Sequence, residues 1–77
     1  MTNETDKAVG TQLQSLRVYA GLGIACAAER LSIGAEELGA YEAGAQRPQP
    51  SVLLAMAECY EVPPSRVFAL LAASHNT

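Results

Sequence analysis

Few side chains in this sequence of 77 residues could carry out catalysis or hold a metal ion. The single histidine, His75, lies close to the carboxyl terminus, and Cys26 and Cys59 lie in separate segments without Cys-x-x-Cys spacing. A metal site needs such ligands grouped at short spacings, and a catalytic site needs a nucleophile or a paired acid and base. The acidic residues form no convincing inward pair, and no glycine-rich loop that could cradle phosphates is present. We therefore expect no enzyme activity, no metal and no cofactor.

The two cysteines indicate free thiols rather than a disulfide framework. Structural disulfides are rare in a reducing cytoplasm, so we expect Cys26 and Cys59 to be core or half-buried residues there. The amino terminus has no apolar signal core, and no apolar run approaches the roughly 20 residues that span a membrane. The sequence therefore predicts a soluble, cytoplasmic protein without a membrane partner.

Composition favours a small helical domain. Hydrophobic residues make up 49% of the chain, Trp is absent and there is one Phe. Ala and Leu suit close helix packing, whereas strands favour branched and aromatic residues. A chain of this length buries only about 60% of the surface that its unfolded form exposes, so the core of this single domain must be small.

The charge balance makes DNA a weak partner. Five Lys and Arg residues stand against eight Asp and Glu residues, which gives a net charge of −3. DNA-binding proteins usually present a basic face that neutralises phosphates. The charge does not exclude DNA, because a dimer can concentrate its few arginines on one side.

The apolar spacing predicts five short helices, and therefore an all-α fold. The first begins near Gly10 or Thr11, and Gly- and Pro-containing breaks separate the others. The other four are expected at residues 24–31, 35–43, 52–60 and 66–72. We expect a flexible arm at residues 1–8, the domain at 9–73 and a frayed tail at 74–77. The expected core consists of Leu13, Leu16, Leu22, Ala28, Leu31, Leu38, Tyr41, Leu53, Ala57 and Phe68.

The sequence of residues 24–44 predicts two short helices joined by a tight turn. It is IACAAERLSIGAEELGAYEAG. Ala28 is small enough to let the second helix lie across the first, and Gly34 falls in the break. Together with Arg47 and Pro48 just beyond it, this pattern resembles the helix-turn-helix of the lambda-repressor and Cro family of transcription regulators. The resemblance covers roughly residues 13–71 and implies a five-helix DNA-binding fold, with the recognition helix at residues 35–43.

The resemblance also implies an ion pair between Arg17 and Glu42. In this family an arginine of the first helix commonly bonds an acidic residue just after the recognition helix, and these two residues occupy the matching positions. A guanidinium held by a carboxylate would tie the first helix to the end of the recognition helix.

The positions that face bases in this family lack the side chains that read bases. By resemblance these positions are Ala35, Glu36 and Ala40, and Ile24 stands where the family often has a phosphate-binding glutamine. Base reading takes hydrogen-bonding side chains such as Arg, Asn and Gln. Glu36 and Glu37 suit the positive end of the helix dipole, but they would repel a phosphate backbone. The recognition helix is therefore degenerate, although an alanine methyl can contact thymine and Glu36 can accept from cytosine.

The same residues predict a surface that faces protein. Small and apolar side chains bordered by carboxylates let the helix of a partner approach closely. The surface consists of Ile24, Ile33, Ala35, Glu36, Glu37, Gly39 and Ala40. Glycine inside a helix lowers helix stability by roughly 1 kcal/mol relative to alanine. The presence of Gly39 is therefore explained either by close packing of a partner at this position or by neutral evolutionary drift. Arg47, in the following loop, matches a position from which the family reaches phosphate, or is a solvated charge.

We therefore expect a small bacterial or phage regulatory protein that acts mainly by contact with another transcription regulator, as an antiactivator or antirepressor. Two alternatives stay open: a conventional DNA-binding repressor or activator, for which a dimer is allowed, and the antitoxin of a toxin–antitoxin pair. The fold alone does not decide among these functions. The apolar residues of the helix at residues 66–72 would also allow a homodimer contact.

Overall fold

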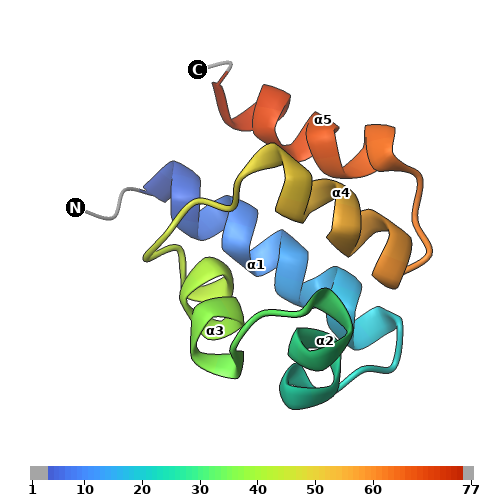
Figure 1. The fold of residues 1–77 in the computed structure, drawn as a ribbon. Helices are drawn as coiled ribbons and strands as arrows, with labels where there is room; N and C mark the ends of the chain where they lie inside the picture. Colours follow the sequence, from blue (N-terminus) through green and yellow to red (C-terminus); the bar gives the residue numbers. More distant parts are fainter. Residues whose placement is uncertain (1–3, 76–77) are drawn as a thin grey trace.

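The structure is a computed structural model that describes residues 4–75, with side chains described for residues 7–69. This part of the chain forms five helices and no strand, so the all-α prediction is confirmed (Figure 1). The helices are α1 (Glu4–Tyr19), α2 (Ile24–Leu31), α3 (Ala35–Ala43), α4 (Pro50–Cys59) and α5 (Pro64–His75). No helix in the described part is both long enough and apolar enough to cross a lipid bilayer.

The outer helices are longer than the sequence predicts. Helix α1 begins at Glu4 rather than near Gly10, so part of the expected arm is helical, and residues 1–3 lie outside the described residues. Apolar periodicity misses this start because residues 4–7 are all polar and add nothing to the apolar repeat. Helix α5 begins at Pro64, whose missing N–H is not needed in a first helical turn, and extends to His75. The expected tail is therefore partly helical, and residues 76–77 are not described.

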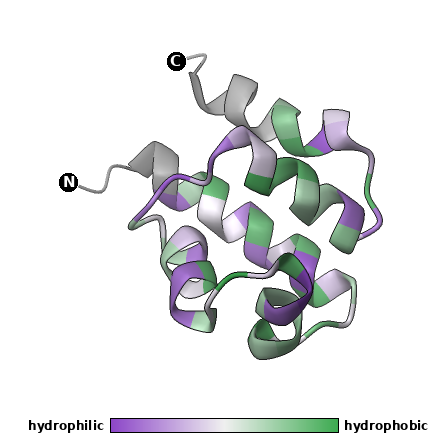
Figure 2. Ribbon diagram, in the orientation of Figure 1, coloured by the Kyte–Doolittle hydropathy of each residue, from purple (hydrophilic) through white to green (hydrophobic). Residues whose placement is uncertain are grey.

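The helices enclose one core in which α4 is central. Helix α4 packs against both α2 and α5, and Figure 2 shows that it is largely hydrophobic. Helix α1 packs against α3 and α5. The buried apolar residues are Val9, Leu13, Ala27, Ala28, Leu38, Tyr41, Leu53, Met56, Ala57, Tyr60 and Val67.

The predicted core is largely correct, with one error. Leu16, Leu22 and Leu31 are only partly buried, but they pack against the core. Phe68 is exposed, whereas its neighbour Val67 is fully buried. Consecutive residues of a helix point about 100° apart, so only one of these two can face the core, and the smaller side chain does so.

The turn between α2 and α3 depends on a residue that the sequence did not single out. Helix α2 ends in Ser32, whose φ of 61° places it in the left-handed region, and the Ser32 N–H donates to the carbonyl of Glu29. Gly34, expected to make the break, has a φ of −74° and precedes the first residue of α3. Gly44 closes α3 with a φ of 80°, the conformation expected of it.

Gly10 allows α1 to lie directly against the end of α3. A Cβ atom at this position would lie 2.6 Å from the carbonyl oxygen of Tyr41 and closer still to that of Glu42. Both neighbours are backbone atoms at the end of a helix, which cannot turn aside as a side chain can. The approach of α1 to α3 therefore requires glycine at this position.

Two glycine substitutions inside helices should have opposite effects. Gly10→Ala should lower the free energy of unfolding by about 1–3 kcal/mol, because the new methyl group overpacks the α1–α3 contact. Gly39→Ala is the matched control, since its Cβ would lie 3.7 Å from Cδ1 of Ile24, an ordinary contact. It should raise stability by up to about 1 kcal/mol. Urea unfolding of the wild type and both variants measures the free energy of unfolding. Equal changes in the two variants would show that the close approach at Gly10 does not require glycine.

Candidate functional site

The first turn of α3 is presented to solvent with two carboxylates and a methyl group. Ala35, Glu36 and Glu37 are all exposed, and Gly39 and Ala40 are half-buried one turn later. Helix α3 also contains Glu42 but no basic residue. We refer to Ile24, Ala35, Glu36, Glu37, Gly39 and Ala40 as the α3 face.

Ile33 does not belong to the exposed surface that the sequence predicts. It is half-buried and packs against the core. Its N–H donates to the carbonyl of Ala28 at 3.0 Å, which holds the turn folded back onto α2. The residue therefore serves the packing of the helix-turn-helix rather than the α3 face.

The two adjacent carboxylates of α3 differ in their surroundings. The Tyr41 hydroxyl donates a 2.7 Å hydrogen bond to Glu37, four residues earlier in the helix. This hydrogen bond, followed by burial, raises the pKa of Tyr41 above its ordinary value. The Glu37 carboxylate is thus fixed against α3 by Tyr41, whereas Glu36 is exposed in the first turn of α3. The i, i+4 spacing of Glu37 and Tyr41 is the signal by which the sequence could have shown this bond.

A hollow of about 330 Å³ opens where α1, α2 and α3 meet. It is lined by Gln14, Ile24, Gly39, Glu42 and Ala43. Gly39 has room for a methyl group, so the packing of the chain itself does not require a glycine there. Gln14 and Ala43, which sequence reasoning missed, extend the α3 face into a concave site.

The ion pair expected from the sequence is present beneath this hollow. Nε of Arg17 lies 2.7 Å from one carboxylate oxygen of Glu42, and its NH2 nitrogen donates to the other at 3.0 Å. The two side chains are only 10% and 6% exposed. The hydrogen bond to Glu42 raises the pKa of Arg17 above its ordinary value. A further nitrogen of Arg17 donates to the carbonyl of Leu22 at 2.8 Å, so one guanidinium joins α1, the following turn and α3.

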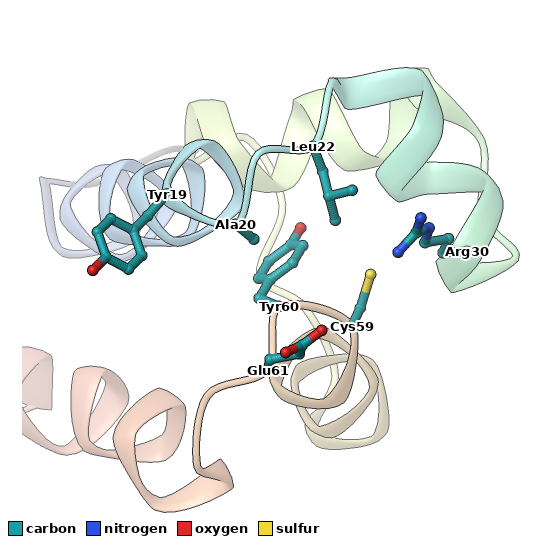
Figure 3. Close-up of a pocket in the computed structure, with 7 residues that line it drawn as sticks. All are labelled: Tyr19, Ala20, Leu22, Arg30, Cys59, Tyr60 and Glu61. Carbon is teal, nitrogen blue, oxygen red and sulfur yellow. The ribbon is translucent and has the colours of Figure 1, made fainter.

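The remaining arginines stand mostly away from α3. Arg30 and Arg66 line two separate hollows that share Tyr19, the first at α2 and α4 and the second at α1 and α5 (Figure 3 shows the first). Arg47 is exposed in the loop that follows α3. The basic residues of this acidic chain are therefore not gathered around the helix that would enter a DNA groove.

Neither cysteine belongs to a disulfide or, among the described residues, to a group that could hold a metal ion. Both are free, and Cys26 is exposed, which corrects the expectation that it is core or half-buried. Cys59 is half-buried, and burial raises the pKa of its thiol. Within the described residues, no three His, Cys, Asp or Glu side chains gather in a way that could hold a metal ion.

Tyr60 carries a buried polar group close to the ion pair. Its hydroxyl has no hydrogen-bond partner among the described residues, and the residue is 3% exposed. Figure 3 shows its ring pointing from the end of α4 toward the turn that contains Ala20 and Leu22. Burial, followed by the charge of Glu42, raises the pKa of Tyr60 to about 12.

The comparisons with known proteins place the chain in a family. Residues 8–70 match the family described as "Helix-turn-helix domain". The fold is similar to that of the clp gene regulator ClgR from C. glutamicum, with a TM-score of 0.80 and 20% sequence identity over 96% of this chain and 95% of that chain. No curated protein matches the sequence. The chain therefore belongs to this helix-turn-helix domain family.

Breaking the ion pair from one side should destabilise the fold strongly. Arg17→Met leaves the Glu42 carboxylate buried without its partner, which should lower the free energy of unfolding by about 3–5 kcal/mol. The double variant Arg17→Met and Glu42→Leu should recover much of this loss, because no charge is then left unpaired. Urea unfolding at neutral pH provides the measurement. A double variant as unstable as Arg17→Met would mean that the lost bond to Leu22, rather than the charge, dominates.

Tyr60 should make the protein sensitive to alkali. The pKa of Tyr60 is about 12 in the folded state and about 10 in the unfolded state. The contribution of its neutral hydroxyl to the free energy of unfolding is therefore complete below pH 10 and is lost as the pH rises toward 12. This loss should amount to about 2 kcal/mol at pH 12. Tyr60→Phe should reduce the loss, and should raise stability at pH 7 by about 1 kcal/mol because it removes an unpartnered hydroxyl. Unfolding curves of both proteins at the two pH values decide this, and a less stable Tyr60→Phe variant at pH 7 would contradict it.

Proposed function

We propose that this protein is a transcription regulator that acts mainly by binding another transcription regulator through the α3 face, as an antiactivator or antirepressor. One observation carries the proposal above all others. The exposed start of α3 holds two carboxylates and no base-reading side chain, yet it adjoins a hollow bordered by Ile24 and Gly39.

Electrostatics opposes the use of this face on DNA. A recognition helix enters the major groove with its N-terminal residues toward the bases, between two rows of phosphates. Affinity there comes largely from cations that neutralise phosphates and release counterions. In this chain Glu36 and Glu37 occupy the first turn, and the best-placed guanidinium of α1, that of Arg17, is already bound by Glu42. Placing α3 in a groove would therefore bring like charges together.

The same features suit a protein partner. Ile24 is exposed, and with Gly39 and Ala43 it gives the hollow an apolar lining. A projecting aliphatic side chain of the partner would lose contact with water there, which is the main favourable term in association. The carboxylate of Glu36 beside it favours a partner with basic residues around that side chain. We infer a partner surface that is apolar at its centre and basic at its rim.

Conventional DNA binding is the second candidate. It is favoured by the family to which the chain belongs and by Arg47, which lies in the loop after α3. A base-specific complex would then rest on the alanines and on Glu36, whose discrimination is limited to a thymine methyl and a cytosine amino group.

A bulky cation at the centre of the α3 face should abolish partner binding. Ala40→Arg adds a long side chain that can extend from its half-buried position into solvent, so the fold should survive. Ala8→Arg is the matched control, because Ala8 is exposed and lies almost on the opposite side of α1 from Gly10, which contacts α3. Partner capture from the native cells, followed by calorimetry with the purified partner, should show tight binding for Ala8→Arg and none for Ala40→Arg. Equal affinity of both variants, with unchanged thermal melts, would place the contact elsewhere.

The affinity for DNA separates the two candidates directly. At physiological salt, mobility-shift assays with fragments of the source genome should reveal no sequence-specific complex tighter than about micromolar, the nonspecific range. A nanomolar complex with one fragment, weakened by Glu36→Ala or Arg47→Ala, would make the conventional DNA-binding function the better one.

A further inference from the structure

A hollow of about 270 Å³ lies between the end of α1, helix α2 and the end of α4 (Figure 3). Arg30 of α2 and Glu61, just after α4, bring one charge of each sign to its lining. Among the described residues, Arg30 forms no salt bridge within the chain. Pockets for drug-sized ligands measure about 300–1,000 Å³, so this hollow suits a smaller molecule. A cation that the chain does not neutralise thus stands beside a space of the size of a small metabolite.

The lining of this hollow also contains a polar group that the chain leaves unsatisfied. The Tyr60 hydroxyl is buried and has no hydrogen-bond partner among the described residues. Figure 3 shows it pointing into the space framed by Ala20, Leu22 and Arg30. Buried polar groups in native structures nearly always have a partner. An occupant of the hollow could supply the partner that the chain itself does not.

Leu22 controls access to this hydroxyl. Its side chain lies next to the Tyr60 hydroxyl in the wall of the hollow. The backbone of Leu22 is fixed, because the NH1 nitrogen of Arg17 donates to its carbonyl at 2.8 Å. The side chain is only half-buried, so it can change rotamer without breaking that bond. We therefore expect an occupant to reach the hydroxyl by displacing one leucine side chain while the turn keeps its path.

The lining between the two charged residues is largely apolar. Ala20, Leu22 and the ring of Tyr60 supply hydrocarbon surface, and the Cys59 thiol lies beside them. Burial raises the pKa of this thiol, so it is uncharged at neutral pH and leaves the charge of Arg30 available. An uncharged thiol packs as a small apolar group does. The hollow therefore offers a cation, a hydroxyl and a short apolar wall.

We propose that this hollow binds a small aliphatic carboxylate, either a simple carboxylic acid or an amino acid. One carboxylate oxygen accepts a hydrogen bond from the guanidinium of Arg30, and the other accepts one from the Tyr60 hydroxyl. The short aliphatic body lies against Leu22 and Cys59, where it loses contact with water. In an amino acid the ammonium group would face the carboxylate of Glu61. The site shares no residue with the α3 face, so it does not depend on what that face binds.

An NMR titration of the isotope-labelled full chain with sodium isovalerate tests the site. Saturable shifts should appear at the backbone amides of Leu22, Cys59 and Tyr60, with a Kd of about 10 mM or tighter. The isovalerate methyl groups should show nuclear Overhauser contacts to those of Leu22. Isovaleramide has the same shape without the charge, so it should bind at least about tenfold more weakly. Inorganic phosphate, which has charge but no apolar body, should also bind more weakly than isovalerate.

Three variants separate binding from a structural role. Arg30→Gln should weaken isovalerate binding at least about tenfold. Arg66→Gln is the matched control, because it removes the same charge from the separate hollow between α1 and α5, and its Kd should equal that of the wild type. Tyr60→Phe should weaken binding about three- to tenfold although it is expected to stabilise the fold, so this loss cannot come from unfolding.

Leucine identifies the kind of carboxylate. Tighter binding of leucine than of isovalerate, lost in Glu61→Gln, supports an amino acid, whereas equal or weaker binding of leucine supports a simple carboxylic acid. The proposal is overturned if isovalerate up to about 50 mM, several times the expected Kd, gives no saturable shifts. It is also overturned if isovaleramide or phosphate binds as tightly as isovalerate, or if Arg30→Gln binds isovalerate as the wild type does.

Discussion

The buried contact between Arg17 and Glu42 determines how the other parts of this small domain are arranged. Two hydrogen bonds of Arg17 to Glu42 and a third to the carbonyl of Leu22 fix α1, the turn after it and the end of α3 relative to one another, at the place where Gly10 allows the two helices to approach. A core made largely of alanine, leucine and valine specifies the angles between packed helices only weakly. A bidentate ion pair between a guanidinium and a carboxylate, by contrast, forms only within a narrow range of geometries. The orientation of α3 thus depends on a polar contact inside an apolar domain.

Sequence reasoning succeeded where a local pattern corresponds to a single physical requirement. The apolar repeats gave the helices, and the spacing of Arg17 and Glu42 relative to the helix-turn-helix gave the ion pair. It was wrong where two neighbouring residues competed for one buried position, as at Val67 and Phe68, and where polar residues extend a helix beyond its apolar stripe, as at Glu4. Such choices depend on packing that no local pattern contains.

The candidate site shows the same division. Ala35, Glu36 and Glu37 are exposed as the sequence predicts, whereas Gly39 and Ala40, expected on the same exposed surface, are half-buried. The hollow that adjoins them was not foreseen, since Gln14 and Ala43 reach it only through the crossing of α1 and α3. The inward position of Ile33 follows from the path of a turn. Concave sites are properties of how helices cross, and the sequence of each helix alone does not contain them.

The two sides of α3 carry separate tasks, and this separation has an evolutionary consequence. Leu38, Tyr41 and Glu42 provide the attachment of the helix to the rest of the domain, and all three are buried. The residues on its outer side contribute little to that attachment, so substitutions there are nearly neutral for folding. A lineage can therefore exchange one class of binding partner for another through a few point changes on a single helix, while the scaffold beneath remains under unchanged selection.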